Sequence, residues 1–188
     1  MNFNKHYDLI GKHAFLGASN YHWLRYDKDK LIATYRNKLA VKRGTELHDF
    51  AQRAITLKRK MPRNSETVNR YINDAIGFRL HPEQPLMYSD ICFGTADAIG
   101  YDERTNFVRI HDLKTGQTPA SMDQLLIYLA MFCLEYGIDP EDIKAELRIY
   151  QNDDVDILNP TADDLMPVVE TMVESEECIS QLILEEGE

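Results

Sequence analysis

Apolar side chains recur at helical spacing through most of the first 80 residues. One such stretch predicts a helix from an N-cap at Ser19 to about Lys38. A second helix is predicted to open at Gly44-Thr45 and to stop before Pro62, and a third, short helix covers residues 66–76. The first part of the chain is therefore predicted to be helical.

The pattern changes to strand character after residue 81. His81-Pro-Glu-Gln-Pro85 suggests an irregular crossing, followed by a strand over 86–101 with an interruption at Gly94 and another over 107–114. The polar segment 102–106 between them predicts a hairpin. With the turn centred between Arg104 and Thr105, the numbers of facing residues sum to 209. Asp97 then faces Asp112, with Cβ atoms about 5 Å apart.

A helix and a further strand are predicted after the hairpin. Thr115-Gly116-Gln117 allows a sharp turn into a helix that covers the sheet, and residues 144–150 form the next strand. The apolar positions of this helix are Met122, Leu125, Leu126, Leu129 and Cys133. The order is α-β-β-β-α-β, an α/β fold with a mixed sheet flanked by helices and extra helices at both ends.

An amphipathic helix is predicted over residues 162–186. We expect its apolar face to pack on the far side of the domain, because few other elements are present to cover the sheet. Docking of this helix to a protein partner is the alternative.

Length and composition agree with one domain over residues 1–188. The domain would comprise a basic helical part over 1–81, a sheet and helix over 86–150, and the acidic helix over 162–186. No apolar run approaches the roughly 20 residues that span a bilayer, and the first residues lack a secretory signal, so we expect no membrane partner and a cytoplasmic protein. The three separated cysteines favour reduced thiols over a disulfide framework or a cysteine-held metal cluster.

The net charge of −10 hides a strong asymmetry. Residues 1–81 hold 16 Lys and Arg against 7 Asp and Glu, a net +9, whereas residues 82–188 hold 5 against 24, a net −19. A basic surface in the first part is suited to nucleic acid. The alternative is that basic helices pair with acidic ones inside the fold.

Two facing carboxylates on adjacent strands carry a chemical implication. Like charges so placed destabilise a sheet unless a cation lies between them, and alternation also puts Lys114 on the face that carries Asp112. A hard divalent ion with oxygen ligands is the natural partner. Mg²⁺ or Mn²⁺ is the expected cofactor.

Four segments resemble, in the same order, the motifs of the PD-(D/E)XK nuclease superfamily and of its RecB-like exonuclease group. The resemblance spans roughly residues 17–150 and implies a restriction-endonuclease-like fold. The four segments are Gly44-Thr-Glu-Leu-His48, Gly94-Thr-Ala-Asp97, Asp112-Leu-Lys-Thr-Gly116 and Gln124-Leu-Leu-Ile-Tyr128.

The resemblance also implies roles for these residues. The implied metal ligands are His48, Asp97, Asp112 and the backbone carbonyl of Leu113. Lys114 would orient the attacking water and offset charge in the transition state, and Gln124 and Tyr128 would contact DNA or hold Lys114. The residues expected to bind nucleic acid are Ser19, Arg43, Thr45, Arg53, Thr115, Gln124 and Tyr128.

Each motif alone has a structural explanation. His48 suits a surface position in the first turn of a helix, Asp97 suits a turn, and Asp112 with Lys114 suits a surface ion pair. Their joint occurrence in order favours a metal-dependent DNA exonuclease of recombination, repair or phage DNA processing, in a bacterial or phage-infected cell. The alternatives are a non-catalytic module that binds DNA or protein, and an acidic protein that mimics DNA and inhibits another enzyme.

Overall fold

The computed structural model describes residues 5–187. The chain divides into two compact units, Met1–Arg43 and Gly44–Glu188, and each unit is described by itself. The four motif segments all lie in the second unit. The single domain expected from the length stays a prediction.

The first unit contains two short 3₁₀ helices, η1 (Tyr7–Leu9) and η2 (Ala18–Arg25), and the beginning of the long helix α1 (Lys28–Thr56). The prediction that Ser19 caps a helix is wrong, because Ser19 lies inside η2. Asp27 caps α1 instead, and its carboxylate accepts a hydrogen bond of 2.8 Å from the Lys30 amide. The predicted helix start at Gly44 is also wrong, since α1 continues through this residue.

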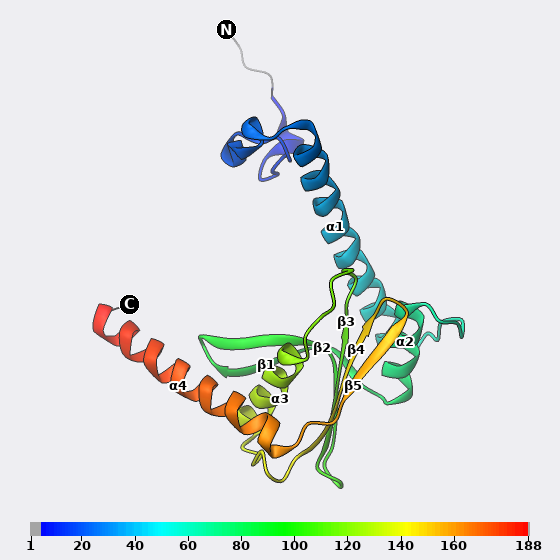
Figure 1. Ribbon diagram of the computed structural model, residues 1–188, viewed down its shortest axis with the longest axis vertical. Helices are drawn as coiled ribbons and strands as arrows, with labels where there is room; N and C mark the ends of the chain where they lie inside the picture. The colour runs from blue at the N-terminus through cyan, green and yellow to red at the C-terminus, as the bar shows by residue number, and fades with distance from the viewer. Residues whose placement is uncertain (1–4, 188) are drawn as a thin grey trace. The chain divides into compact units, whose positions relative to one another are not determined.

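The second unit is built on a five-stranded mixed sheet in the order β1-β2-β3-β4-β5 (Figure 1). The strands are β1 (His81–Ser89), β2 (Cys92–Asp102), β3 (Phe107–Leu113), β4 (Lys144–Gln151) and β5 (Asp154–Leu158). Only the β3–β4 pairing is parallel in this sheet. With α2 (Thr67–Gly77), α3 (Asp123–Tyr136) and α4 (Ala162–Glu186), the structure confirms the α/β class and the α-β-β-β-α-β order.

Helices cover both faces of the sheet. The core on one face lies under α3 and the start of α4, and the predicted inward positions of α3 all contribute to it. Its largest members are Leu86, Ile99, Ile110, Leu125, Leu129, Phe132, Leu147, Ile149 and Leu165. The core on the other face lies under α2 and the last turns of α1, and includes Ala51, Ala54, Ile55, Tyr71, Ile72, Ala75, Ala98, Leu113 and Tyr150.

The hairpin of β2 and β3 has the predicted register. Its ladder runs from Asp102 facing Phe107 to Ala98 facing His111, and every pair sums to 209. The ladder ends there, one residue before Asp97 and Asp112.

The first strand differs from its prediction. β1 already begins at His81 and includes both Pro82 and Pro85, and β2 runs through Gly94 without a break. The turn that separates the two strands lies at residues 90–91. An edge strand tolerates proline because one side of it donates no ladder hydrogen bonds. β5 is a further strand that the sequence pattern did not predict.

The C-terminal helix is confirmed over the predicted range, but only its first half is covered. Leu165 is 2% exposed, and Val168, Val169 and Met172 pack against the core beneath α3. The second half leaves Ile179 and Leu182 about half exposed. A protein partner for that half stays a prediction. None of the helices within residues 5–187 is long and apolar enough to cross a membrane.

Candidate active site

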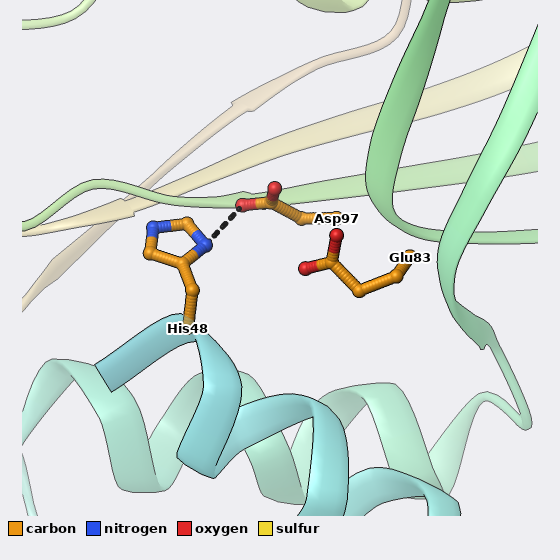
Figure 2. A group of neighbouring side chains, drawn as sticks. All are labelled: His48, Glu83 and Asp97. Carbon is orange, nitrogen blue, oxygen red and sulfur yellow. Dashed lines mark ion pairs between the residues drawn. The ribbon is translucent and has the colours of Figure 1, made fainter. Parts of the chain in front are cut away.

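Three side chains from three different elements converge beside the sheet. His48 projects from α1, Glu83 from β1 and Asp97 from β2, and one ligand atom of each lies within 4.8 Å of the others (Figure 2). The His48 Nδ1 and Asp97 Oδ2 atoms are 3.4 Å apart. One imidazole nitrogen and two carboxylates form a donor set that suits Mg²⁺ or Mn²⁺.

Both strands are distorted where the cluster forms. The β1–β2 register places Glu83 across from Asp97, yet the ladder skips this pair, and Glu83 has a positive φ of 49°. β2 changes face at Asp97, because Ala96 joins the core under α3 whereas Ala98 joins the core under α2. Non-glycine residues with positive φ concentrate at functional sites, where the surrounding structure maintains the strain.

Asp97 is anchored from the neighbouring strand. Its Oδ2 accepts a hydrogen bond of 2.9 Å from the Leu113 amide, which replaces the ladder bond lost at this point. The side chain is 16% exposed. The backbone of β3 therefore fixes the direction of this carboxylate.

The electrostatic environment of Asp97 is unfavourable for an anion. Burial and, next, the charge of Asp112 raise the pKa of Asp97 from the usual 3.8 to about 6, although the Leu113 amide and His48 act in the lowering direction. Burial also raises the pKa of Tyr71, and the charges of Asp97, Asp112 and Glu83 act in the same direction. All three carboxylates therefore act on the same buried tyrosine.

A second group of side chains holds Lys114. Its Nζ donates a hydrogen bond of 3.0 Å to Asp112 Oδ1 and one of 2.7 Å to Gln124 Oε1. Gln124 in turn donates from Nε2 to the Tyr128 hydroxyl at 3.1 Å. Gln124 and Tyr128 are one turn apart on α3, so this helix and β3 together set the position of the ammonium group.

Asp112 is 2% exposed and has one carboxylate oxygen without a hydrogen bond. Oδ2 lies 2.8 Å from Lys114 Nζ, an ion-pair distance, but the donor geometry favours Oδ1, and no hydrogen bond reaches Oδ2. A buried carboxylate oxygen normally has a hydrogen-bond donor or a metal as its partner. Asp112 Oδ2 could therefore accept a further hydrogen bond or coordinate a cation.

Two glycines of the motifs make room for site residues. A Cβ at Gly44 would stand 2.7 Å from Thr115 Oγ1, and a Cβ at Gly94 would stand 2.9 Å from Tyr128 Cε1. Both contacts are closer than Cβ atoms tolerate. The glycines therefore serve close approach, of α1 to the end of β3 and of β2 to α3.

The residues present fit a divalent cation. Two observations support this: burial and the charge of Asp112 raise the pKa of Asp97, and Asp112 Oδ2 is buried without a hydrogen bond. A bound cation would compensate both. His48, Glu83 and Asp97 would hold it.

The sequence-predicted site residues fall into two groups. The structure brings together His48, Asp97 and Leu113 in one cluster, and Asp112, Lys114, Gln124 and Tyr128 in the adjacent one. Leu113 contributes its amide to Asp97, and metal ligation by its carbonyl stays a prediction. The 4.8 Å cluster does not include Asp112, whose carboxylate is paired with Lys114.

The residues predicted to bind nucleic acid are more scattered. Thr115 lies at the end of β3 against Gly44, and Thr45 and Arg53 are on exposed positions of α1. Ser19 and Arg43 belong to the first unit. A shared DNA surface for these residues stays a prediction.

Glu83 is the residue that the sequence reasoning missed. It lies between two prolines in a segment that looked irregular, and only the β1–β2 register shows that it faces Asp97. That register could not be predicted once the strand was started at Leu86 and interrupted at Gly94. A carboxylate between Pro82 and Pro85 next to a strand was the available signal.

No known protein family, curated protein or solved structure matches the chain. The geometry of the site is therefore the basis for a functional conclusion.

Proposed function

We propose that this protein is a divalent-metal-dependent deoxyribonuclease that hydrolyses phosphodiester bonds in DNA. One observation carries the proposal: a His-Glu-Asp cluster lies beside a lysine that is held by a buried aspartate and by a glutamine on the covering helix. Phosphodiester hydrolysis needs a cation for the developing negative charge and a positioned group for the attacking oxygen. The resemblance of the four motif segments to RecB-like nucleases leads to the same activity.

His48, Glu83 and Asp97 would hold the Mg²⁺ or Mn²⁺ ion, and Asp112 Oδ2 is a nearby buried acceptor that is ion-paired with Lys114 but has no hydrogen bond. When bound, the ion would polarise the scissile phosphate and lower the pKa of a water molecule. The distorted backbone at Glu83 and the Leu113 amide keep the carboxylates directed at one point.

Lys114 is the residue of the chain that would act on the reacting oxygens. Asp112 and Gln124 restrict its ammonium group to one position, so a bound phosphate meets a preorganised positive charge. The side chain is 29% exposed and borders a cavity of about 320 Å³, lined also by Leu47, Thr115 and Asp153. A phosphodiester has room to approach from this side.

DNA is the proposed substrate and the cytoplasm of a bacterial or phage-infected cell the proposed location. The net +9 of residues 1–81 supports a polyanionic substrate. We further propose exonuclease behaviour in recombination, repair or phage DNA processing, on the resemblance alone. A protein partner at the acidic helix α4 is a separate proposal that this activity does not require.

Cleavage assays with end-labelled linear DNA and covalently closed circles test the proposal. Wild type should degrade linear DNA with Mg²⁺ or Mn²⁺ and not with EDTA, and Lys114→Ala should lose at least about 100-fold in rate. Lys144→Ala, which removes the same charge from an exposed position on β4, is the matched control and should retain full rate. Equal rates for Lys114→Ala and wild type would refute the assignment, and rapid cleavage of the circles would refute the exonuclease behaviour.

A further inference from the structure

Helices α1 and α2 end in the same motif at the same place in the second unit. At the end of α1 the Lys58 amide donates to Ile55 O at 2.9 Å and the Arg59 amide to Ala54 O at 2.8 Å. At the end of α2 the Arg79 amide donates to Ile76 O at 3.2 Å and the Leu80 amide to Ala75 O at 2.9 Å. These pairs of bonds define a Schellman motif, whose first residue past the helix has a left-handed backbone.

The residue at the left-handed position is unusual in both helices. Lys58 has a φ of 53° and Arg79 a φ of 60°, where glycine is the usual choice. The chain itself uses glycine at the equivalent position elsewhere, since Gly137 directly follows α3 and Gly187 directly follows α4. Two long cationic side chains are thus kept at positions where their backbone is strained.

Lys58 and Arg79 both line one groove, together with the apolar residues Ile55, Ile76 and Leu80. This groove has a volume of about 580 Å³ and is also bordered by His81 and Pro82 at the beginning of β1. Neither Lys58 nor Arg79 is paired with a carboxylate within the described residues. The groove therefore presents two uncompensated cations and an imidazole around a hollow that a phosphate group can enter.

The C-terminal ends of α1 and α2 repel a bound anion, but this repulsion is weaker than the attraction from the side chains of Lys58 and Arg79. Each helix C-terminus carries roughly −0.5 charge, so two of them together roughly cancel one of the two cations. A net positive charge therefore remains at the groove. The simpler explanation, that each cation only complements the negative end of its own helix, does not account for both of them lining one groove.

The groove lies near the candidate active site along the chain. His81 precedes Glu83 by two residues of an extended strand, about 7 Å, and Lys58, just past the end of α1, follows His48 by ten residues, at most about 15 Å. DNA advances about 3.4 Å per nucleotide along its axis. A strand whose scissile phosphate lies at the cluster therefore reaches the groove within a few nucleotides.

We propose that Lys58, Arg79 and His81 form a phosphate-binding subsite that holds the backbone of the bound DNA strand a few nucleotides from the scissile bond. This inference rests on the proposed nuclease function and extends it. The subsite recognises the phosphodiester and not the base, so it positions the strand without sequence preference.

Substitution by glycine separates binding from stability. Lys58→Gly with Arg79→Gly removes both charges while relieving the left-handed backbone, so the melting temperature should stay equal to that of wild type or rise. Affinity for labelled DNA, measured by fluorescence anisotropy in EDTA, should fall at least about 10-fold, and the slope of log K against log salt should decrease by about one. The double variant Lys58→Gln with Arg79→Gln keeps the strained backbone and should lose the same affinity.

The control removes two positive charges elsewhere in the same unit. Arg104→Ala with Lys144→Ala changes exposed positions at a turn and a strand end, and should lower affinity no more than about twofold. A DNA strand with one uncharged methylphosphonate linkage at successive positions gives a second measurement. Wild type should lose affinity at one linkage near the cleaved bond, and the glycine variant should lose nothing further there.

The outcomes distinguish this inference from the proposed function. If wild type cleaves DNA but the glycine variant binds it as tightly as the control variant does, the subsite is refuted and the nuclease stands. If inorganic phosphate protects wild type through Lys58 and Arg79 while DNA affinity is independent of them, the groove binds free phosphate and the proposal also fails. If wild type neither binds nor cleaves DNA, both fail together.

Discussion

Asp97→Asn should stabilise the metal-free protein at pH 8 while abolishing its response to metal. Burial and the charge of Asp112 raise the pKa of Asp97 from the usual 3.8 to about 6. In the metal-free state an ionised Asp97 therefore destabilises the fold at pH 8 by roughly 3 kcal/mol, two pKa units at about 1.4 kcal/mol each. Asparagine removes the charge and keeps an oxygen that can accept the hydrogen bond from the Leu113 amide.

The sign follows from proton binding. The folded carboxylate binds a proton more tightly than the unfolded one, so this site's destabilisation is absent below pH 3.8 and complete above pH 6. The stability gained by Asp97→Asn should shrink from about 3 kcal/mol at pH 8 to about 0.5 kcal/mol at pH 4. The variant must be compared with wild type at each pH, because His111 contributes the opposite trend to both proteins.

Urea unfolding in EDTA measures this difference. In a thermal scan of a chain of this size, a difference of 3 kcal/mol corresponds to a shift of roughly 6–12 °C in melting temperature. Adding Mn²⁺ should then stabilise wild type and leave Asp97→Asn unchanged. Asp156→Asn, an exposed carboxylate on β5, is the control and should change neither quantity. If Asp97→Asn increases the free energy of unfolding equally at pH 8 and pH 4, the pKa of Asp97 is not raised in the folded protein and the reasoning is refuted.

Three further predictions concern the elements around the site. Gly94→Ala places a Cβ 2.9 Å from the Tyr128 ring, so we expect a loss of about 1–2 kcal/mol in urea unfolding and slower DNA cleavage; an unchanged rate would show that Tyr128 does not position the site. Burial lowers the pKa of His111 to about 3, so the unfolded state binds the proton more tightly. Relative to His111→Phe, wild type should lose about 2 kcal/mol between pH 7.5 and pH 5 by urea unfolding; a constant difference would contradict this. Deleting residues 162–188 removes the buried Leu165 and uncovers the core against which it packs, so it should lower the melting temperature in a thermal scan; an unchanged value would mean that α4 does not support the fold.

Local periodicity was sufficient for much of the fold. The hairpin register followed from one polar turn and the strict alternation of strands, and this placed Asp97 and Asp112 on neighbouring strands. The covering helix α3 and the C-terminal helix followed from their apolar spacing. These features depend on contacts within one or two elements.

Two of the errors have a common physical cause in glycine. Gly44 looked like a helix start and Gly94 like a strand interruption, because glycine usually marks such points. In the structure each remains inside a regular element and makes room for a side chain from a distant segment, Thr115 or Tyr128. The single sequence contains no local sign of that distant neighbour. Glu83 was missed for another reason, because Pro82 and Pro85 made the beginning of its strand look irregular.

The two outer strands of the sheet restrict how the protein can assemble. β1 includes Pro82 and Pro85, which have no amide hydrogen to offer another strand, and β5 is a five-residue strand with Asp154 and Asp156. Such edges resist the addition of a strand from another chain. We therefore expect a larger assembly or a peptide partner to engage a surface other than the two edges of the sheet.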